Sequence, residues 1–317
     1  MSKSQLKLPL ILASVLFTSI HVEARPDFCT IPLELRNGVP FVRLMVNGSG
    51  PFTFIVDTGT NKEAIVSPQL AKALGLPVVD QISMVDLTGQ NRTRVDEVAI
   101  DTISIAGHQF HGVRALVHKS LTSEGAYDGV LGFSLFRNTL LTLDFPQRCM
   151  ALSDGDLLES RDSDVLPFVA PRNIPMVTLT VGGQPVTALI DSGGAGLNLP
   201  RSFALHVEFV KSTEILEEAR TQTSSYFLRG GEMKGQILLG SHVFKDPFVL
   251  IGEALPVASV GAIPLQDFAI TFDQKHLLVR FRANRNKHRL ERRQLQMSRS
   301  MTAPGLPGDL TLAKAGN

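Results

Sequence analysis

The sequence predicts an all-β protein with two barrel-like lobes of similar plan. Three observations support this fold class: apolar residues recur with period two, Gly and Pro mark frequent turns, and the chain repeats itself. The two most similar segments, residues 38–57 and 173–191, each read as two strands joined by a turn. Helical stretches are few and short, so strands dominate both copies.

Each repeated segment ends on an acidic residue. The alternating apolar residues of its first strand are Val42, Leu44 and Val46 in one copy and Val177, Leu179 and Val181 in the other. Such alternation is typical of a half-buried strand. After the turn, a second apolar strand at 52–56 or 186–190 leads directly into Asp57 or Asp191. Each copy is therefore expected to be a β-hairpin with a carboxylate at its exit.

Later segments also correspond between the copies. Ser67, Pro68 and Gly75 bound a short helix, as N-cap, first-turn and terminating residues, and residues 199–205 are its weaker counterpart. These repeats place an N-terminal lobe at residues 30–152 and a C-terminal lobe at 165–281. The polar, acidic stretch between them, 153–164, reads as a linker.

The chain begins like an exported protein. Lys3 and Lys7 precede an apolar run of about 13 residues, and small residues at Val22 and Ala24 fit signal-peptide cleavage after Ala24. A membrane anchor is the alternative, but the run is shorter than the ~20 residues that span a bilayer. We therefore expect a secreted or periplasmic protein with no membrane span in its mature form.

Residues 282–317 form a basic tail. It is expected to be a disordered, solvated extension, the alternative being a patch that contacts an anionic surface. The whole chain has a formal net charge of only +1, which argues against a nucleic-acid partner.

Cys29 and Cys149 are the two cysteines of the chain. In an oxidising compartment they could form one disulfide joining the start of the mature chain to the end of the first lobe. Two buried free thiols are the alternative. A pair this far apart does not indicate a metal site.

The motifs after the two strands are Asp57-Thr58-Gly59 and Asp191-Ser192-Gly193. One such tripeptide alone is weak, because Asp-x-Gly is common in turns. Here both copies follow an apolar strand at the same place in a repeated unit. Each is also followed 70 to 75 residues later by a glycine-ending element, Val130-Leu131-Gly132 or Ser259-Val260-Gly261.

These motifs resemble the pepsin/retropepsin superfamily of aspartic peptidases, and most closely its compact bacterial, retropepsin-like members. Residues 54–60 match the apolar-apolar-Asp-Thr-Gly signature, residues 188–194 match its second-copy form, and residues 127–132 resemble the Asp-Gly-apolar-apolar-Gly element. The resemblance spans residues 38–281. It implies acid-protease-type lobes with the active site between them, and a peptide or protein as substrate.

The chemistry of two neighbouring carboxyl groups suits peptide hydrolysis. Because Asp57 and Asp191 cannot both ionise cheaply, they are expected to share one proton. The ionised partner can then take a proton from water, and the protonated partner can donate to the carbonyl oxygen. The sequence does not assign the two roles.

Supporting residues follow from the motifs and the resemblance. Gly59 and Gly193 permit tight turns in which backbone N–H groups approach the carboxylates. The resemblance implies that Thr58 and Ser192 bond across the lobe interface and that Gly132 and Gly261 let a strand pass close to the loops. Thr60 and Gly194 depart from the usual pattern, and Gly194 could loosen the loop around Asp191.

A hairpin with its turn at Thr88, Gly89 and Gln90 is expected after the first helix, built from residues 82–87 and 92–100. The resemblance implies a flap that closes over substrate. Pepsin-type members carry a tyrosine there and this chain does not, so backbone and small polar groups are expected to take over.

Four other interpretations of the sequence are possible. One is a protein of peptidase fold that binds peptides or a partner without cleaving them. A second is a metal site at His108, His111 and His118, for which surface histidines are the better interpretation. A serine hydrolase or nucleotide site is disfavoured because no Gly-x-Ser-x-Gly or Walker-type loop occurs. No metal or cofactor is expected, and one chain would suffice for the site.

Overall fold

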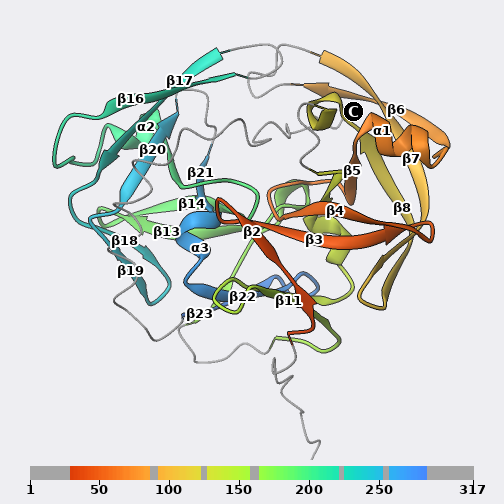
Figure 1. Cartoon of the computed structure of the whole chain (residues 1–317). Coiled ribbons are helices and arrows are strands. Elements are labelled where there is room, and N and C mark those ends of the chain that lie inside the picture. Colours follow the sequence, from red (N-terminus) through yellow and green to blue (C-terminus); the bar gives the residue numbers. More distant parts are fainter. Residues whose placement is uncertain are drawn as a thin grey trace, which may run out of the picture.

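The computed structural model describes residues 29–85, 92–122, 127–157, 164–220, 225–252 and 257–283. The expected signal peptide lies outside these residues, as does all but the first two residues of the basic tail. The described chain is mostly β-strand, curled into two barrel-like lobes, which confirms the all-β prediction (Figure 1). None of its helices is long and apolar enough to cross a bilayer.

The first repeated hairpin consists of β3 (Val39–Val46) and β4 (Ser49–Asp57), paired antiparallel. Its turn places Asn47 and Gly48 at φ of 49° and 76°. This left-handed backbone is what a two-residue hairpin turn needs, and Asn-Gly adopts it at low cost. The Asn47 side chain also accepts a bond from the backbone N–H of Thr102 at 3.0 Å, tying the turn to the neighbouring strand.

An eight-stranded sheet forms the first lobe, in the order β2-β3-β4-β9-β5-β8-β7-β6, and an additional β3–β7 pairing curls it. The remaining strands are β2 (Glu34–Arg36), β5 (Ala64–Val66), β6 (Val78–Val85), β7 (Arg92–Ile105), β8 (His108–Val117) and β9 (Gly129–Gly132). Helix α1 (Pro68–Ala73) begins at the predicted cap, where Ser67 Oγ accepts the Leu70 N–H at 3.1 Å. Short 3₁₀ turns follow at η1 (Lys119–Thr122) and η2 (Phe133–Phe136).

The second lobe repeats this plan in a nine-stranded sheet, in the order β16-β17-β20-β15-β21-β14-β13-β18-β19. Its strands are β13 (Met176–Val181), β14 (Gln184–Asp191), β15 (Leu197–Pro200), β16 (Glu214–Arg220), β17 (Ser225–Glu232), β18 (Gln236–Leu239), β19 (His242–Lys245), β20 (Phe248–Gly252) and β21 (Ala258–Gly261). Three short helical segments accompany them, η3 (Pro171–Asn173), α2 (Arg201–Ala204) and α3 (Ala262–Leu265). The pair β13–β14 is the second predicted hairpin.

A six-stranded sheet contains strands from both halves of the chain and lies at the bottom of Figure 1. Its order is β1 (Ile31–Pro32), β11 (Cys149–Ser153), β10 (Leu140–Asp144), β22 (Phe268–Asp273), β23 (Leu278–Ala283) and β12 (Val165–Pro167). At its centre β10 pairs antiparallel with β22, and the hydroxyls of Thr142 and Thr271 meet at 2.9 Å. The two halves of the chain are therefore joined by backbone hydrogen bonds as well as by apolar contact.

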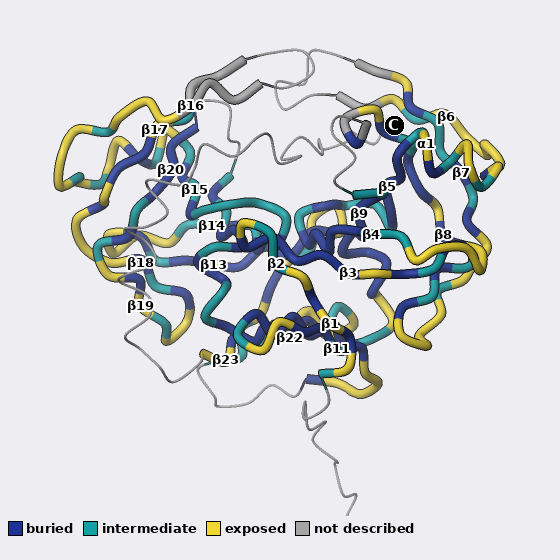
Figure 2. The backbone as a smooth tube through the Cα atoms, in the orientation of Figure 1, coloured by how far each residue is buried: buried dark blue, intermediate teal, exposed yellow. Residues whose placement is uncertain are grey.

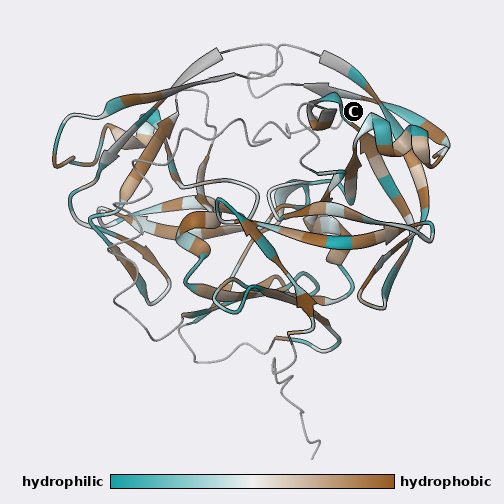
Figure 3. Cartoon of the chain, viewed as in Figure 1, coloured by the Kyte–Doolittle hydropathy of each residue, from teal (hydrophilic) through white to brown (hydrophobic). Residues whose placement is uncertain are grey.

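Phenylalanine supplies much of the core at this junction. Phe133 packs edge-on against Phe168 and Phe272, with ring centroids 6.0 and 5.2 Å apart. Figure 2 shows the buried residues concentrated in the central strands, while the outer hairpins carry most of the exposed ones. Figure 3 shows hydrophobic and hydrophilic residues interspersed along the strands of both lobes. The main apolar core thus runs through both lobes.

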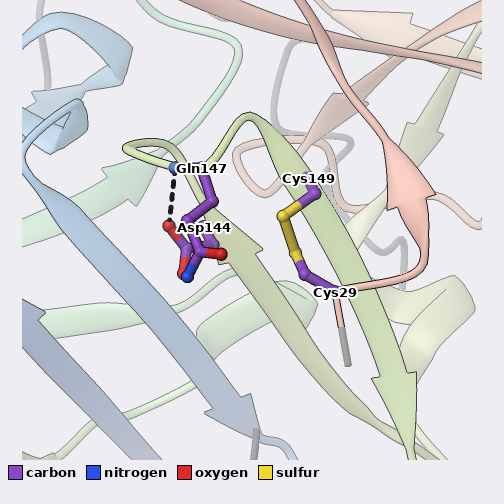
Figure 4. Close-up of a disulfide and its surroundings, with 4 residues drawn as sticks. All are labelled: Cys29, Asp144, Gln147 and Cys149. Atoms are coloured by element: carbon purple, nitrogen blue, oxygen red, sulfur yellow. Dashed lines mark hydrogen bonds between the residues drawn. A yellow bond between two sulfur atoms is a disulfide. The ribbon is translucent and has the colours of Figure 1, made fainter. Parts of the chain in front are cut away.

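Cys29 and Cys149 form the disulfide that was one of the two sequence-based alternatives (Figure 4). Their Cα atoms are 5.6 Å apart. The bond joins the residues before β1 to the first residue of β11, next to the Pro32–Cys149 register pair. It closes a loop with a sequence separation of 120, which includes the whole first-lobe sheet.

Replacing both cysteines, Cys29→Ser with Cys149→Ser, is expected to lower the free energy of unfolding. The unfolded chain regains the freedom of a long loop, which typically amounts to about 2–5 kcal/mol. Urea unfolding followed by circular dichroism measures the difference. The control is the wild type under reducing conditions, which should behave like the double variant. Equal midpoints for the oxidised wild type and the double variant would contradict the expectation.

Candidate active site

Asp57 and Asp191 end corresponding strands, β4 and β14, in the two lobes. Each strand has a parallel neighbour that ends beside the aspartate: Asp57 is in register with Gly132 of β9, and Asp191 with Gly261 of β21. The hairpins thus bring both carboxylates to the junction of the lobes. Asp57 is 7% exposed and Asp191 is half-buried.

Gly132 and Gly261 lie where a side chain would not fit. A Cβ at Gly132 would collide with the carbonyl oxygen of Lys62, and one at Gly261 would lie 2.7 Å from the carbonyl carbon of Ala195. Both contacts are with backbone of the loop that follows the neighbouring aspartate. The close strand approach that the resemblance implies is therefore present in both lobes.

Asp57 is held by donors from its own loop. The Gly59 N–H donates to Oδ1 at 2.8 Å, and the Thr60 hydroxyl donates to Oδ2 at 2.7 Å. Thr60 is fully buried, so this bond has no water to compete with it. Both oxygens of the carboxylate are thereby fixed in orientation.

Asp191 has a different set of donors. Its Oδ1 accepts the N–H groups of Gly193 at 3.1 Å and of Gly194 at 2.8 Å. Gly194 therefore helps to hold the carboxylate, where looseness was expected from its size. A Cβ at Gly194 would lie 2.5 Å from Asp191 Oδ2, which explains why the residue is glycine. The second loop uses a backbone donor where the first loop uses the Thr60 hydroxyl.

The two loops are bonded to each other by a reciprocal set of four hydrogen bonds. The Thr58 N–H donates to Ser192 Oγ, and the Ser192 N–H donates to Thr58 Oγ1, each at 3.0 Å. The hydroxyls donate onward across the interface, Thr58 to the Ile190 carbonyl at 2.6 Å and Ser192 to the Val56 carbonyl at 2.7 Å. Because both side chains are about 1% exposed, all four bonds are shielded from water.

The two carboxyl groups contact one another and titrate as a pair. Burial raises the pKa of Asp57, although hydrogen bonds from Thr60, Gly59 and Asp191 oppose the shift. Burial, then the charge of Asp57, raises the pKa of Asp191 well above its ordinary value of 3.8. One proton shared between them is the arrangement that these environments favour.

Tyr127 belongs to the motif at residues 127–132, but the sequence did not indicate that its side chain contributes to the site. Burial, followed by the negative charge of Asp57, raises the pKa of its hydroxyl to about 12. Its ring packs edge-on against Phe41 at 5.7 Å and belongs to an apolar cluster that includes Ile82 of β6. The charge of Asp57 therefore acts on an aromatic hydroxyl that lies outside the predicted flap hairpin β6–β7.

Two hairpins lie at the top of Figure 1, one from each lobe. The first is β6–β7, the predicted flap, whose turn residues Thr88, Gly89 and Gln90 lie outside the described residues. The second, β16–β17, was not predicted. Its signal was available, since two strand-like runs flank the polar stretch 221–224.

The three histidines considered for a metal site do not gather. His108 and His111 lie exposed on β8, and His118 is buried at the end of that strand. Among the described residues, the group of side chains that could hold a metal ion is a different one, Asp156, Asp273 and His276.

Residues 42–135, from β3 to η2, match a family model described as aspartyl protease. Over these residues the chain is similar to an aspartyl protease family of the retropepsin-like type. The matched region includes the Asp57 loop and Gly132, and Asp191 lies beyond it. No curated protein matches the sequence significantly.

Thr58→Val tests how strongly the two loops that follow Asp57 and Asp191 depend on their mutual hydrogen bonds. Valine has nearly the same shape, but it leaves the Ser192 N–H and the Ile190 carbonyl without their partner. We expect a loss of about 1–3 kcal/mol in the free energy of unfolding, measured in urea, because these groups are buried. Thr58→Ser is the matched control: it keeps the hydroxyl, as the second loop does with Ser192, and should cost less. Equal losses would assign the effect to the methyl group.

Asp191→Asn should stabilise the protein at neutral pH. Because the folded-state pKa of Asp191 is raised, the folded protein holds more protons than the unfolded chain from pH 3.8 up to that raised pKa. Stability is therefore lost as the pH rises through this window, and a neutral amide escapes the loss. We expect the variant to be more stable than the wild type above the window, and to show no gain below pH 3.8.

Asp273→Asn is the control for this prediction, because the pKa of Asp273 is lowered where that of Asp191 is raised. Burial acts to raise the pKa of Asp273, but hydrogen bonds from His276 and Leu157 outweigh it and hold the pKa below 3.8. The stabilisation from this carboxylate is therefore present above pH 3.8 and lost as the pH falls through its folded-state pKa. Urea unfolding of the wild type, Asp191→Asn and Asp273→Asn from pH 3 to 7 gives the free energy of unfolding as a function of pH. Relative to the wild type, the two variants should diverge in opposite directions as the pH rises. Parallel curves for all three proteins would contradict both pKa shifts.

Proposed function

We propose that this protein is an aspartic endopeptidase whose catalytic residues are Asp57 and Asp191, one from each of two homologous lobes, 30–152 and 165–281. The observation that carries the proposal is the contact between a buried and a half-buried carboxyl group whose loops are bonded across the lobe junction. Burying two acids side by side costs stability, and such a cost is typical of sites built for proton transfer.

The donors around the pair suggest which aspartate keeps the proton. Asp57 accepts the Thr60 hydroxyl, which stabilises its ionised form. Asp191 has the more strongly raised pKa, and the charge of Asp57 contributes to that shift. The two carboxyl groups share one proton, and our proposal places it on Asp191 with Asp57 as the ionised partner.

Peptide hydrolysis follows from this arrangement. Asp57 takes a proton from a water molecule as its oxygen attacks the carbonyl carbon, and Asp191 donates its proton to the carbonyl oxygen. The tetrahedral diol then collapses as Asp191 takes a proton back and Asp57 gives its proton to the amide nitrogen, so that the C–N bond breaks. Both carboxyl groups return to their starting states, and no cofactor is needed.

The surroundings of the pair suit a peptide substrate. Hairpins β6–β7 and β16–β17, on one side of the molecule, could cover an extended chain from both lobes and limit water access. The Tyr127 hydroxyl is protonated throughout the physiological range because its pKa is about 12, so it can donate a hydrogen bond to substrate. A monomer contains all of these parts.

We also propose that the protein works in a secreted or periplasmic setting after cleavage near Ala24, with 153–164 as the linker between lobes. The disulfide between Cys29 and Cys149 supports this location, because such bonds persist in oxidising compartments.

The decisive experiment is cleavage of a peptide library from pH 3 to 8 by the purified protein, Asp57→Asn and Asp191→Asn. Each variant should lose at least the ~10²–10⁴-fold that positioned acid–base groups contribute. Asp144→Asn is the matched control, because Asp144 is a buried first-lobe carboxylate that caps the turn at Gln147. It should keep cleavage activity and lose only stability.

Two outcomes would overturn the proposal. A folded wild type that binds library peptides without cleaving them would make the protein a peptide-binding module of peptidase fold. Cleavage that persists in both aspartate variants would assign the chemistry to another site or to a contaminant.

A further inference from the structure

A second cluster of polar side chains lies on the six-stranded sheet, at the turn between β22 and β23. Asp273 ends β22, His276 lies in the turn, and Asp156 reaches the same point from the segment after β11. One donor atom from each residue lies within 4.8 Å of the other two. This sheet is at the bottom of Figure 1, and the two hairpins over the aspartates are at the top.

The spacing of these atoms suits a tetrahedral cation. His276 Nδ1 lies 2.9 Å from Asp273 Oδ2 and 3.5 Å from Asp156 Oδ1. Zinc bound to nitrogen and oxygen at about 2.0–2.1 Å places neighbouring ligand atoms about 3.3 Å apart. The two separations from His276 Nδ1 lie on either side of this ligand–ligand distance. Small rotations of the exposed Asp156 and His276 side chains would therefore bring the three ligand atoms to the spacing that zinc needs.

The central ligand is held in place by the backbone. Asp273 is 2% exposed, and its oxygens accept the N–H of His276 at 3.0 Å and of Leu157 at 2.8 Å. Leu157 is itself buried against Leu140 and Leu278. Asp156 is thereby fixed next to Asp273, while the side chains of Asp156 and His276 stay 48% and 41% exposed, which leaves an approach for an ion.

The first lobe contains a matched turn without the ligands. At the end of β10, Asp144 accepts the Gln147 N–H at 3.0 Å and the Gln147 side-chain amide at 2.9 Å (Figure 4). Residues 144–147 therefore cap their turn as residues 273–276 do, three residues apart. Since glutamine is sufficient for capping, the turn itself does not require an imidazole at position 276.

We propose that Asp156, Asp273 and His276 form a zinc site that fastens the segment between the lobes to the second half of the central sheet. Two carboxylates and one imidazole are ligands that zinc accepts, and an open fourth position would hold water. Calcium and magnesium prefer all-oxygen sets with six or more ligands, which this cluster does not offer.

The ammonium group of Lys275 should compete with a zinc ion bound by Asp156, Asp273 and His276. Its ammonium group lies 3.4 Å from Asp156 Oδ1 and occupies the acidic environment that a cation would take. A bound zinc ion and this ammonium group repel each other, so the lysine should weaken binding. The side chain is 70% exposed and can swing away, so the competition is modest.

The test is isothermal titration of the metal-free full chain with ZnCl₂, together with its thermal unfolding with and without the ion. We expect one site and a higher Tm in zinc, with CaCl₂ giving neither. His276→Gln should weaken zinc binding by more than about tenfold, the lower end of the effect seen even for residues behind the ligands. It should leave the Tm without zinc unchanged, because glutamine makes the same cap in the first lobe.

Two further variants separate a site from general acidity. Asp156→Asn should weaken zinc binding and abolish the zinc-dependent rise in Tm, whereas Lys275→Gln should tighten binding by up to about fivefold. Zinc binding that is unchanged in His276→Gln, or absent in a folded wild type, would overturn the proposal. The readouts are affinity and Tm, so they stand whether or not the protein cleaves peptides.

Discussion

The reciprocal bonds between Thr58 and Ser192 are the constraint on which the rest of the site depends. Each residue gives its N–H to the other's hydroxyl, and each hydroxyl donates to a carbonyl in the opposite lobe. The arrangement has four buried donors and leaves none unpaired, so neither loop can move without exposing a polar group to an apolar core. This fixes the two aspartates next to one another. It also requires that both lobes fold before either loop reaches its final position.

A nearly symmetric frame holds an asymmetric pair of acids. The strands, the glycines and the cross-lobe bonds repeat between the lobes, but Thr60 supplies a hydroxyl to Asp57 where Gly194 supplies only a backbone N–H to Asp191. Each aspartate thus accepts two hydrogen bonds, but from different kinds of donor. The two departures from the repeat are therefore the places where the surroundings of the two carboxylates differ.

Local sequence patterns predicted the parts of the fold that depend on near neighbours. Alternation and turn residues predicted both hairpins that lead to Asp57 and Asp191, and the cap at Ser67 predicted α1. The β10–β22 pairing, the position of Tyr127 and the group Asp156, Asp273 and His276 depend on contacts between residues far apart in the chain. No local period encodes such contacts. The hairpin β16–β17 was missed for another reason, because its two strand-like runs alternate only weakly between apolar and polar residues.

The six-stranded sheet that joins the two lobes and the hairpins β6–β7 and β16–β17 lie in different parts of the molecule. The six-stranded sheet combines strands from both lobes, the disulfide and the buried Phe133–Phe272 contact, so the base of the molecule cannot open without breaking many interactions together. The hairpins β6–β7 and β16–β17 lie at the outer edges of their sheets, where the edge strands β6 and β16 each have a neighbour on one side only. Opening such an edge costs less than parting the central strands. The six-stranded base therefore holds the two lobes together, while the outer hairpins are the less constrained part of the structure.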